Sequence, residues 1–367
     1  MAMRWEFNYL PLGKMIPRLI FSGRPIRPEE PSTMAMKQFS TLKKLSERLG
    51  LSISTVSRAL KDHPDISAAT RKRVKDLAEL SEYEPNTFAL NLRSNQSKII
   101  GVIVPYFQNL FYEYFISALD EEVRKEGYSL LILQSGENVE AELKNLNIMK
   151  KNRVDLLFVS TTENTENIEP LMKLPAYGIP IVFFDRVPVE ENCDKIRFAD
   201  EEAGRMSAKR LIKSKKKHIL CLFTDKPELS IIRKRIVAFQ ETLRKYSPKT
   251  ILDIQFHPDR KTGEKIVLNA LKKKNPPDAL FCIGDNSTIW AMKTLQKKGL
   301  RVPTDIGILS ISNGFIPTLY SPPVTHVLTN GYKLGKLAFT RLKQILEGKT
   351  EVQELIIPAI LIEGGSL

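Results

Sequence analysis

The first strong hydrophobic pattern along the chain lies between residues 41 and 60, where it predicts two short helices separated by a turn. In the first helix the apolar stripe has members at i, i+3 and i+7, namely Leu42, Leu45 and Leu49. Gly50 then supplies the turn, since glycine readily adopts the left-handed conformation that ends a helix. The inner face of the second helix is formed by Val56, Ala59 and Leu60.

Hydroxyl residues stand ahead of these helices as N-caps, Thr41 before the first and Ser52 before the second. A third helix is expected to follow Ser67, with Thr70 near its start. Its inner face consists of Val74, Leu77 and Ala78. Three short helices around one core follow the plan of a helix-turn-helix DNA-binding domain. Helical hairpins that merely pack share the bare pattern, so both interpretations stay open at this point.

From Ile99 onward, short β-branched runs alternate with stretches of helical spacing. The runs are apolar on both faces, which favours parallel sheets covered by helices. A second series of such units begins near Asp200, so two lobes with a cleft between them are expected. The predicted strands are 99–104, 129–133, 156–160, 181–184, 218–223, 251–256, 279–283, 306–311, 324–328 and 355–362, and the predicted helices are 111–125, 138–150, 200–212, 229–246 and 331–346.

The segment that follows the third helix decides between the two interpretations. Pro85 stops that helix, residues 87–92 form a marginal helical stretch, and polar linker residues follow. With this segment the sequence resembles the lactose-repressor (LacI) family of bacterial transcription regulators, from about Phe39 to the C-terminus. The residues that stand at the spacings of that family are Thr41, Leu42, the run from Ser54 to Leu60, Ile66, Ser67, Thr70, Arg71, Val74, Tyr83, Pro85 and Asn86.

The resemblance implies an N-terminal all-α helix-turn-helix headpiece and a two-lobed α/β core like that of type I periplasmic binding proteins. In that family the chain crosses between the lobes three times. Residues 1–36 show no period and are expected to be disordered or an upstream extension of the true start. The expected headpiece is then 37–85, the hinge helix and linker 86–97, and the effector-binding and dimerisation core 98–367, with an N-lobe of about 98–198 and 329–350 and a C-lobe of about 199–328 and 351–367.

Composition agrees with a soluble DNA-binding protein. The net charge of +14 and the pI of about 9.5 favour a polyanionic partner, although lysine runs are also typical of solvated helix ends. Cys193, Cys221 and Cys282 are odd in number and widely spaced, so buried reduced thiols are expected and no metal site. An apolar run of about 18 residues, which a membrane-spanning helix requires, is missing. Prolines interrupt the apolar pieces of the first 36 residues, so no secretion signal is predicted and a cytoplasmic location is expected.

The headpiece residues divide by the DNA atoms that they are expected to reach. Ile53, Ser54 and Arg58 would read bases in the major groove, with Arg58 gripping guanine through two hydrogen bonds. Ala89 and Leu92 match minor-groove positions of the family, where a leucine from each of two copies would wedge a central base step. Leu92 could instead pack on the core. Candidates for phosphate contacts are Thr41, Ser52, Thr55, Ser57, Ser67, Thr70 and Asn86.

Polar residues at the carboxyl ends of predicted strands, or on the helices that follow, are the candidates for binding an effector in the cleft. Arg235 stands where the family has an arginine that clamps the effector, and Ser312 replaces an aspartate that is common there. Asp285 has the alternative role of a helix N-cap. A carbohydrate or its phosphate is expected, because two aspartates and one arginine in a cleft suit the vicinal hydroxyls of a sugar. The surplus of basic residues would tolerate an acidic effector. The candidates are Tyr112, Asp185, Arg235, Asp285, Ser312 and Asn313.

The sequence thus predicts a homodimeric regulator that binds a near-palindromic operator in double-stranded DNA and responds to a small-molecule effector. The hinge 87–92 is too short for a stable isolated helix, so it should order only when two copies pack together on DNA. A solute-binding protein without DNA function is the alternative, but it predicts a secretion signal. An enzyme on the same scaffold is a third hypothesis. No GxSxG, phosphate-binding glycine loop or HExxH is present, so no catalytic residues or cofactor are expected.

Overall fold

The computed structural model describes residues 41–83, 96–163, 165, 168–224 and 230–367, and the backbone alone of residues 4–9 and 15–20. The chain divides into two compact units, Met1–Thr87 and Phe88–Leu367.

Near its N-terminus the first unit contains two strands, β1 (Arg4–Tyr9) and β2 (Met15–Ile20), which pair antiparallel. Neither strand is among those predicted from the sequence. In β1, Trp5, Phe7 and Tyr9 alternate with polar residues, which is the period of a strand.

The rest of this unit is a three-helix domain of α1 (Leu42–Leu49), α2 (Ile53–Leu60) and α3 (Ala68–Leu80). The two N-cap predictions are confirmed: the side chains of Thr41 and Ser52 each accept a hydrogen bond from a backbone N–H in the first turn of their helix. Ser67, after which the third helix was expected, caps α3 in the same way. Gly50 ends α1 in the left-handed conformation, at φ 64°. The core consists of Leu45, Val56, Ala59, Val74 and Ala78.

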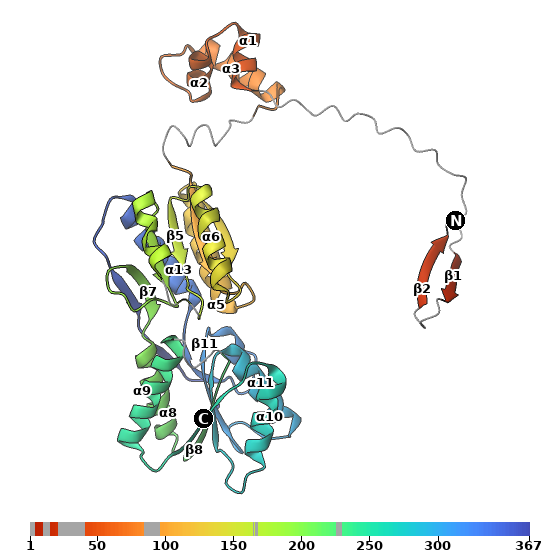
Figure 1. Ribbon diagram of the computed structural model, residues 1–367, viewed down its shortest axis with the longest axis vertical. Coiled ribbons are helices and arrows are strands. Elements are labelled where there is room, and N and C mark those ends of the chain that lie inside the picture. Colours follow the sequence, from red (N-terminus) through yellow and green to blue (C-terminus); the bar gives the residue numbers. More distant parts are fainter. Residues whose placement is uncertain are drawn as a thin grey trace. The chain divides into compact units, whose positions relative to one another are not determined.

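The second unit contains two six-stranded sheets, one in each lobe (Figure 1). In the N-lobe the strand order is β13-β7-β6-β5-β3-β4, and every pair is parallel. Helices α5 (Leu110–Lys125) and α13 (Gly331–Leu346) bury one face, while α6 (Val139–Lys151) and α7 (Glu169–Met172) bury the other. The strands are β3 (Ile99–Val104), β4 (Ser129–Gln134), β5 (Leu156–Val159), β6 (Ile181–Phe184), β7 (Asp194–Phe198) and β13 (Glu354–Ile357), and a 3-10 turn spans Leu174–Tyr177.

In the C-lobe the strand order is β14-β12-β11-β10-β8-β9. Helices α8 (Asp200–Lys213) and α9 (Ser230–Tyr246) cover one face, and α10 (Arg260–Leu271) and α11 (Asp285–Lys297) cover the other. The strands are β8 (His218–Phe223), β9 (Ile251–Phe256), β10 (Ala279–Ile283), β11 (Gly307–Ser312), β12 (Thr325–Leu328) and β14 (Ile360–Ile362), and a short helix α12 spans Phe315–Thr318.

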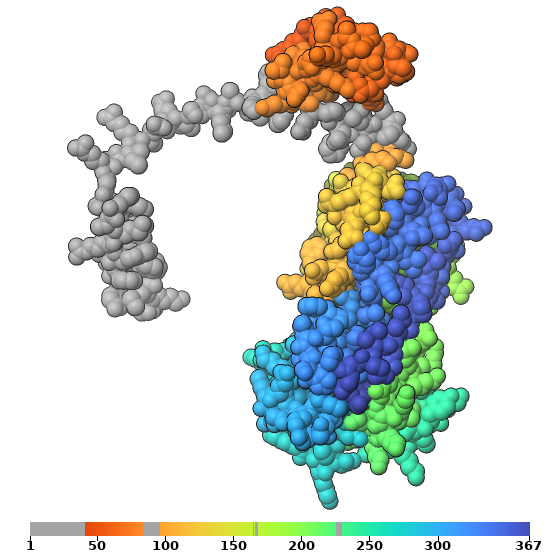
Figure 2. Space-filling model, turned by 180° about the vertical axis from the view of Figure 1, so that it is seen from behind, coloured from red at the N-terminus to blue at the C-terminus, as the bar shows by residue number. Residues whose placement is uncertain are grey.

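The expected last strand, 355–362, is in fact two strands that belong to different lobes. Residues 354–357 form β13, which pairs with β7 of the N-lobe, and residues 360–362 form β14, which pairs antiparallel with β12 of the C-lobe. Pro358 lies between them and has no N–H to continue a ladder. The assignment of all of 351–367 to the C-lobe is thus wrong at β13. Figure 2 shows the blue C-terminal residues passing from one lobe to the other.

The chain crosses between the lobes three times, after β7, after β12 and between β13 and β14. Strand β7, which lies next to β13, is not among the predicted strands, because it begins with the polar residues Asp194 and Lys195 and has only two apolar residues.

Two helix pairs approach closely at glycines. A Cβ on Gly204 of α8 would lie 2.2 Å from the carbonyl oxygen of Arg235 on α9, and a Cβ on Gly331 of α13 would lie 2.2 Å from that of Phe111 on α5. Each of these glycines lies just after a crossover between lobes. The crossovers are thereby packed directly against helices α5 and α9, which carry candidate effector residues.

Among the described residues, no helix is long and apolar enough to span a membrane.

Candidate functional site

The outer face of α2 has the features of a surface that contacts DNA. Ile53 is 46% exposed although it is apolar, and Ser54 and Arg58 are exposed, while Ser57 is half-buried. Arg58 has a solvent-exposed guanidinium whose nearest carboxylate, that of Asp65, is 3.9 Å away. An ion pair this open costs little to exchange for a base edge.

Most of the phosphate-contact candidates lie at the starts of the three helices, whereas Ser57 lies in the middle of α2. Ser52 forms hydroxyl–hydroxyl hydrogen bonds of 2.8 Å with Ser54 and with Thr55, and Ser67 forms one of 2.9 Å with Thr70. Helix N-termini carry partial positive charge and favour anions. Together with Thr41 these hydroxyls are suitably placed for DNA phosphates. The remaining DNA candidates, Asn86, Ala89 and Leu92, lie outside the described residues.

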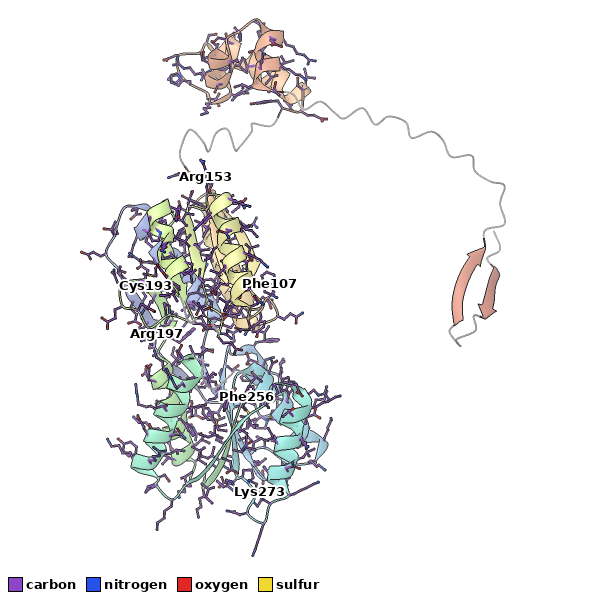
Figure 3. All side chains as sticks on the ribbon, viewed as in Figure 1. Phe107, Arg153, Cys193, Arg197, Phe256 and Lys273 are labelled. Atoms are coloured by element: carbon purple, nitrogen blue, oxygen red, sulfur yellow. The ribbon has the colours of Figure 1, made fainter. Side chains whose placement is uncertain are left out.

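In the second unit, all six candidate effector residues line one cavity of about 420 Å³. Tyr112 lies in the first turn of α5, and Asp185 directly follows β6 of the same lobe. The other four come from the C-lobe and line the facing wall. Arg235 lies on α9, Asp285 begins α11, Ser312 ends β11 and Asn313 follows it. In Figure 3, Phe107 and Phe256 mark the facing ends of the two lobes.

On the N-lobe wall a buried hydrogen-bond network surrounds Asp185. The hydroxyl of Tyr112 donates to Oδ2 of Asp185 over 2.8 Å and shares a hydrogen bond of 3.0 Å with the hydroxyl of Ser160. Burial raises the pKa of Asp185 to about 6, and the positive charge of Arg186 partly opposes this shift. Asp185 also has a left-handed backbone, with φ 58°, which an aspartate adopts more readily than most residues. Asp185 thus combines a strained backbone with a buried carboxyl of raised pKa, and both features are common at functional sites.

On the C-lobe wall the carboxylate of Asp285 accepts hydrogen bonds from the hydroxyl of Ser312 and, at 3.4 Å, from the backbone N–H of Asn313. Burial raises the pKa of Asp285. The side-chain oxygen of Asn313 is taken by the N–H of Gly331, at 3.1 Å, just after the second crossover. Ser312 thus acts as a donor to Asp285, in the position where the family more often has a second carboxylate.

Arg235 is 8% exposed, and its Nε donates to Oδ1 of Asp200 over 2.7 Å. Asp200 begins α8, directly after the first crossover, and is 2% exposed. The contact between Gly204 and the carbonyl of Arg235 sets how far this arginine lies from α8.

Sequence reasoning missed two partners of the cleft residues. The sequence indicates Asp200 only as the start of the second series of units, and it gives no role to Glu137, which forms an ion pair with Arg186 of the cavity lining. Both partners lie far along the chain from the residues that they bind, so no local signal could have paired them.

The described residues contain no cluster of His, Cys, Asp and Glu that could hold a metal ion. All three cysteines are buried and free, as predicted.

Comparison with known proteins follows the same division of the chain. A family model described as bacterial regulatory proteins of the lacI family matches residues 41–86, and a model described as periplasmic binding proteins and sugar binding domain of LacI family matches residues 97–364. The sequence is 27% identical over 314 residues to the HTH-type transcriptional repressor PurR of Vibrio vulnificus, covering 84% of this chain and 93% of that protein. A PurR of Pasteurella multocida is 28% identical over 320 residues, covering 86% and 95% respectively.

Among solved structures, the lac repressor dimer bound to operator and the anti-inducer ONPF superposes with a TM-score of 0.79 at 22% identity, covering 90% of this chain and 99% of that one. The periplasmic binding ribose operon repressor protein of Lactobacillus acidophilus has a TM-score of 0.64 at 25% identity, covering 74% and 98%. These likenesses confirm the predicted fold of a helix-turn-helix headpiece and a two-lobed core.

Proposed function

This chain belongs to the LacI family of bacterial regulatory proteins, and we propose that a carbohydrate bound in its cleft controls how tightly a homodimer holds a near-palindromic operator. As a member of that family it is a DNA-binding transcription regulator with an effector-binding core. Its relatives are transcriptional repressors, so repression is the expected action and enzymatic activity is not. Because its DNA target is the bacterial chromosome, we expect the protein to act in the cytoplasm.

One observation carries the effector proposal: six polar residues chosen from strand ends in the sequence converge from both lobes on one cavity. Asp185 and Asp285 offer carboxylate oxygens, and Asn313 and Arg235 offer amide and guanidinium groups. Vicinal hydroxyls can donate to one such group and accept from another at the same time. A compact polyhydroxy molecule therefore suits this cavity better than an apolar one.

Coupling between effector binding and DNA binding follows from the contacts of the cavity residues with the segments that cross between the lobes. Asn313 is hydrogen-bonded to the second crossover, and Arg235 is bound to Asp200 at the first. A ligand held by both lobes favours one angle between them, and we propose that this angle sets the spacing of the two hinge segments in a dimer. A coupling free energy of about 1–3 kcal/mol is enough to regulate transcription.

Base recognition is tested on the full chain by selecting its preferred operator from random DNA. Arg58→Ala should relax preference at one base pair of each half-site, a loss of about 1–3 kcal/mol there, because a bidentate contact with guanine is removed. Arg48→Ala removes an equal charge from exposed α1 and serves as the control. Equal weakening on all sequences by Arg58→Ala would refute direct readout.

Effector control is tested with Arg235→Ala, using sugars that raise the melting temperature of the unsubstituted protein. The variant should keep its operator affinity and lose the response to sugar. An unchanged dose response would remove Arg235 from the effector site.

A further inference from the structure

The cleft has a charge balance that differs from that of the whole protein. The chain carries a net charge of +14, yet the ionisable acids and bases that line the cavity are Arg186, Arg235, Asp185 and Asp285. Tyr106 and Tyr112 also line the cavity, and the raised pKa of each phenol keeps it neutral. The global surplus of Arg and Lys is thus absent from the described lining of the cavity.

Both arginines are already neutralised by carboxylates that lie behind them. Arg186 pairs with Glu137, with side chains 4% and 11% exposed. Arg235 pairs with Asp200, with side chains 9% and 3% exposed. Buried pairs of this kind are costly to separate, because the abandoned carboxylate would remain desolvated. A ligand anion would therefore have to share each guanidinium with a carboxylate that already neutralises it.

The two lining aspartates have no such compensation. The groups that hydrogen-bond to Asp185 and Asp285 among the described residues are hydroxyls and one backbone N–H, all uncharged. Arg186 and Arg235 lie near Asp185, but each also serves its own carboxylate. His326 lies near Asp285, and burial lowers the pKa of that imidazole, which keeps it neutral. Within the described structure, the cavity lining and the two carboxylates paired with its arginines together comprise two basic and four acidic side chains.

Helix N-termini are the other common anion sites in this kind of fold, and two of them at the cavity carry a polar side chain in or before their first turn. Asn109 caps α5 by accepting from the N–H of Phe111 at 2.9 Å. The carboxylate of Asp285 stands in the first turn of α11.

From this arrangement we infer that the effector carries no negative charge: it is an uncharged or amino-bearing polyhydroxy compound, and Asp285 and Asp185 exclude phosphate and carboxylate derivatives. This inference rests on the proposed function and narrows it. It also revises the expectation from composition that an acidic effector would be tolerated. Hydroxyl or ammonium groups of the ligand donate to the two aspartates, whereas a phosphate placed beside them meets uncompensated like charge.

The test uses matched probes on the full-length protein, with affinity measured by calorimetry and melting temperature. The probes are D-ribose, D-glucose, D-fructose and D-galactose, each with its phosphate ester, and glucosamine. For any sugar that binds, the ester should bind at least tenfold more weakly. A 6-O-acetyl derivative of the same sugar, which adds bulk without charge, should lose less than its phosphate.

Asp285→Asn should reduce the ratio of the affinity for the neutral sugar to the affinity for its phosphate ester at least threefold. The substitution removes one negative charge from the cavity and keeps the shape of the side chain. Glu347→Gln, which removes an exposed carboxylate after α13, should leave the ratio unchanged. An ester that binds as tightly as its parent sugar, or an acetyl derivative rejected as strongly as the phosphate, would overturn the charge inference and leave the regulator function intact. If none of the sugars or sugar phosphates binds, both the charge inference and the proposed control by a carbohydrate are overturned.

Discussion

The contact between Gly204 and Arg235 offers a way to displace an effector residue without touching the cavity. A methyl group at position 204 would lie 2.2 Å from the carbonyl oxygen of Arg235, whereas carbon and oxygen in contact stay at least about 3.3 Å apart, so α8 and α9 must separate by roughly 1 Å. The obstacle is backbone and not a flexible side chain, so the strain cannot be relieved by a rotamer change. Overpacking of this kind costs about 1–3 kcal/mol.

Gly204→Ala should therefore weaken binding of an effector sugar at least about tenfold, since a charge-assisted hydrogen bond is worth about 1.5–3 kcal/mol and tenfold corresponds to about 1.4 kcal/mol. Operator affinity in the absence of sugar should change little, because the headpiece is a separate unit. Calorimetry with the sugar and gel shift with the operator measure the two effects.

Ala208→Gly is the matched control on the same helix. It removes a buried methyl group and lowers helix propensity by about 1 kcal/mol, but it introduces no clash with α9. The control should lower the melting temperature and leave sugar affinity nearly unchanged. If Gly204→Ala binds sugar as tightly as the unsubstituted protein, the position of Arg235 does not depend on the approach of α8, and the coupling drawn from that contact is wrong.

Three further substitutions probe stability. Asp185→Asn should raise the melting temperature at pH 8. The carboxyl has a pKa of about 6 in the folded state against 3.8 in the unfolded state, so its ionisation destabilises the folded protein by about 3 kcal/mol above pH 6. The gain in melting temperature should vanish near pH 4, and a gain that does not depend on pH would contradict this cause. Arg341→Ala should cost about 3–5 kcal/mol by removing the ion-pair partner of Asp194, whose side chain is only 13% exposed. Arg301→Ala, which breaks an exposed pair, should cost less than about 1 kcal/mol in the same urea titration, and similar losses would argue against the importance of the Arg341–Asp194 pair. Ser52→Ala should destabilise the headpiece by about 1 kcal/mol through loss of an N-cap, and an unchanged headpiece transition would show the cap to be unimportant.

The parts of this molecule that the sequence predicts are those set by local rules. The caps Thr41 and Ser52 and the turn at Gly50 depend on a few neighbouring residues. Most cleft candidates follow from one further rule, that the carboxyl ends of parallel strands meet at one edge of a sheet, whereas Arg235 was chosen from the resemblance to the LacI family. Their convergence on one cavity needed no knowledge of side-chain contacts.

What the sequence could not predict depends on partners that are distant along the chain. Asp200 and Arg235 are 35 residues apart, and their pairing depends on how α8 packs on α9. The division of 354–362 between two sheets depends on where both lobes end. The charge of the cleft is likewise a tertiary property, because Glu137 and Asp200 neutralise arginines that composition alone counts as free.

The most direct test of the central claim is thermodynamic linkage between cleft and operator in one purified protein. Operator affinity is measured with and without a saturating sugar that raises the melting temperature, and sugar affinity is measured with and without saturating operator. The account predicts a change of at least about fivefold in operator affinity and the same factor in sugar affinity, because coupling between two sites is reciprocal. Operator affinity that is indifferent to every bound sugar, or no preference for any promoter fragment over bulk genomic DNA, would contradict it.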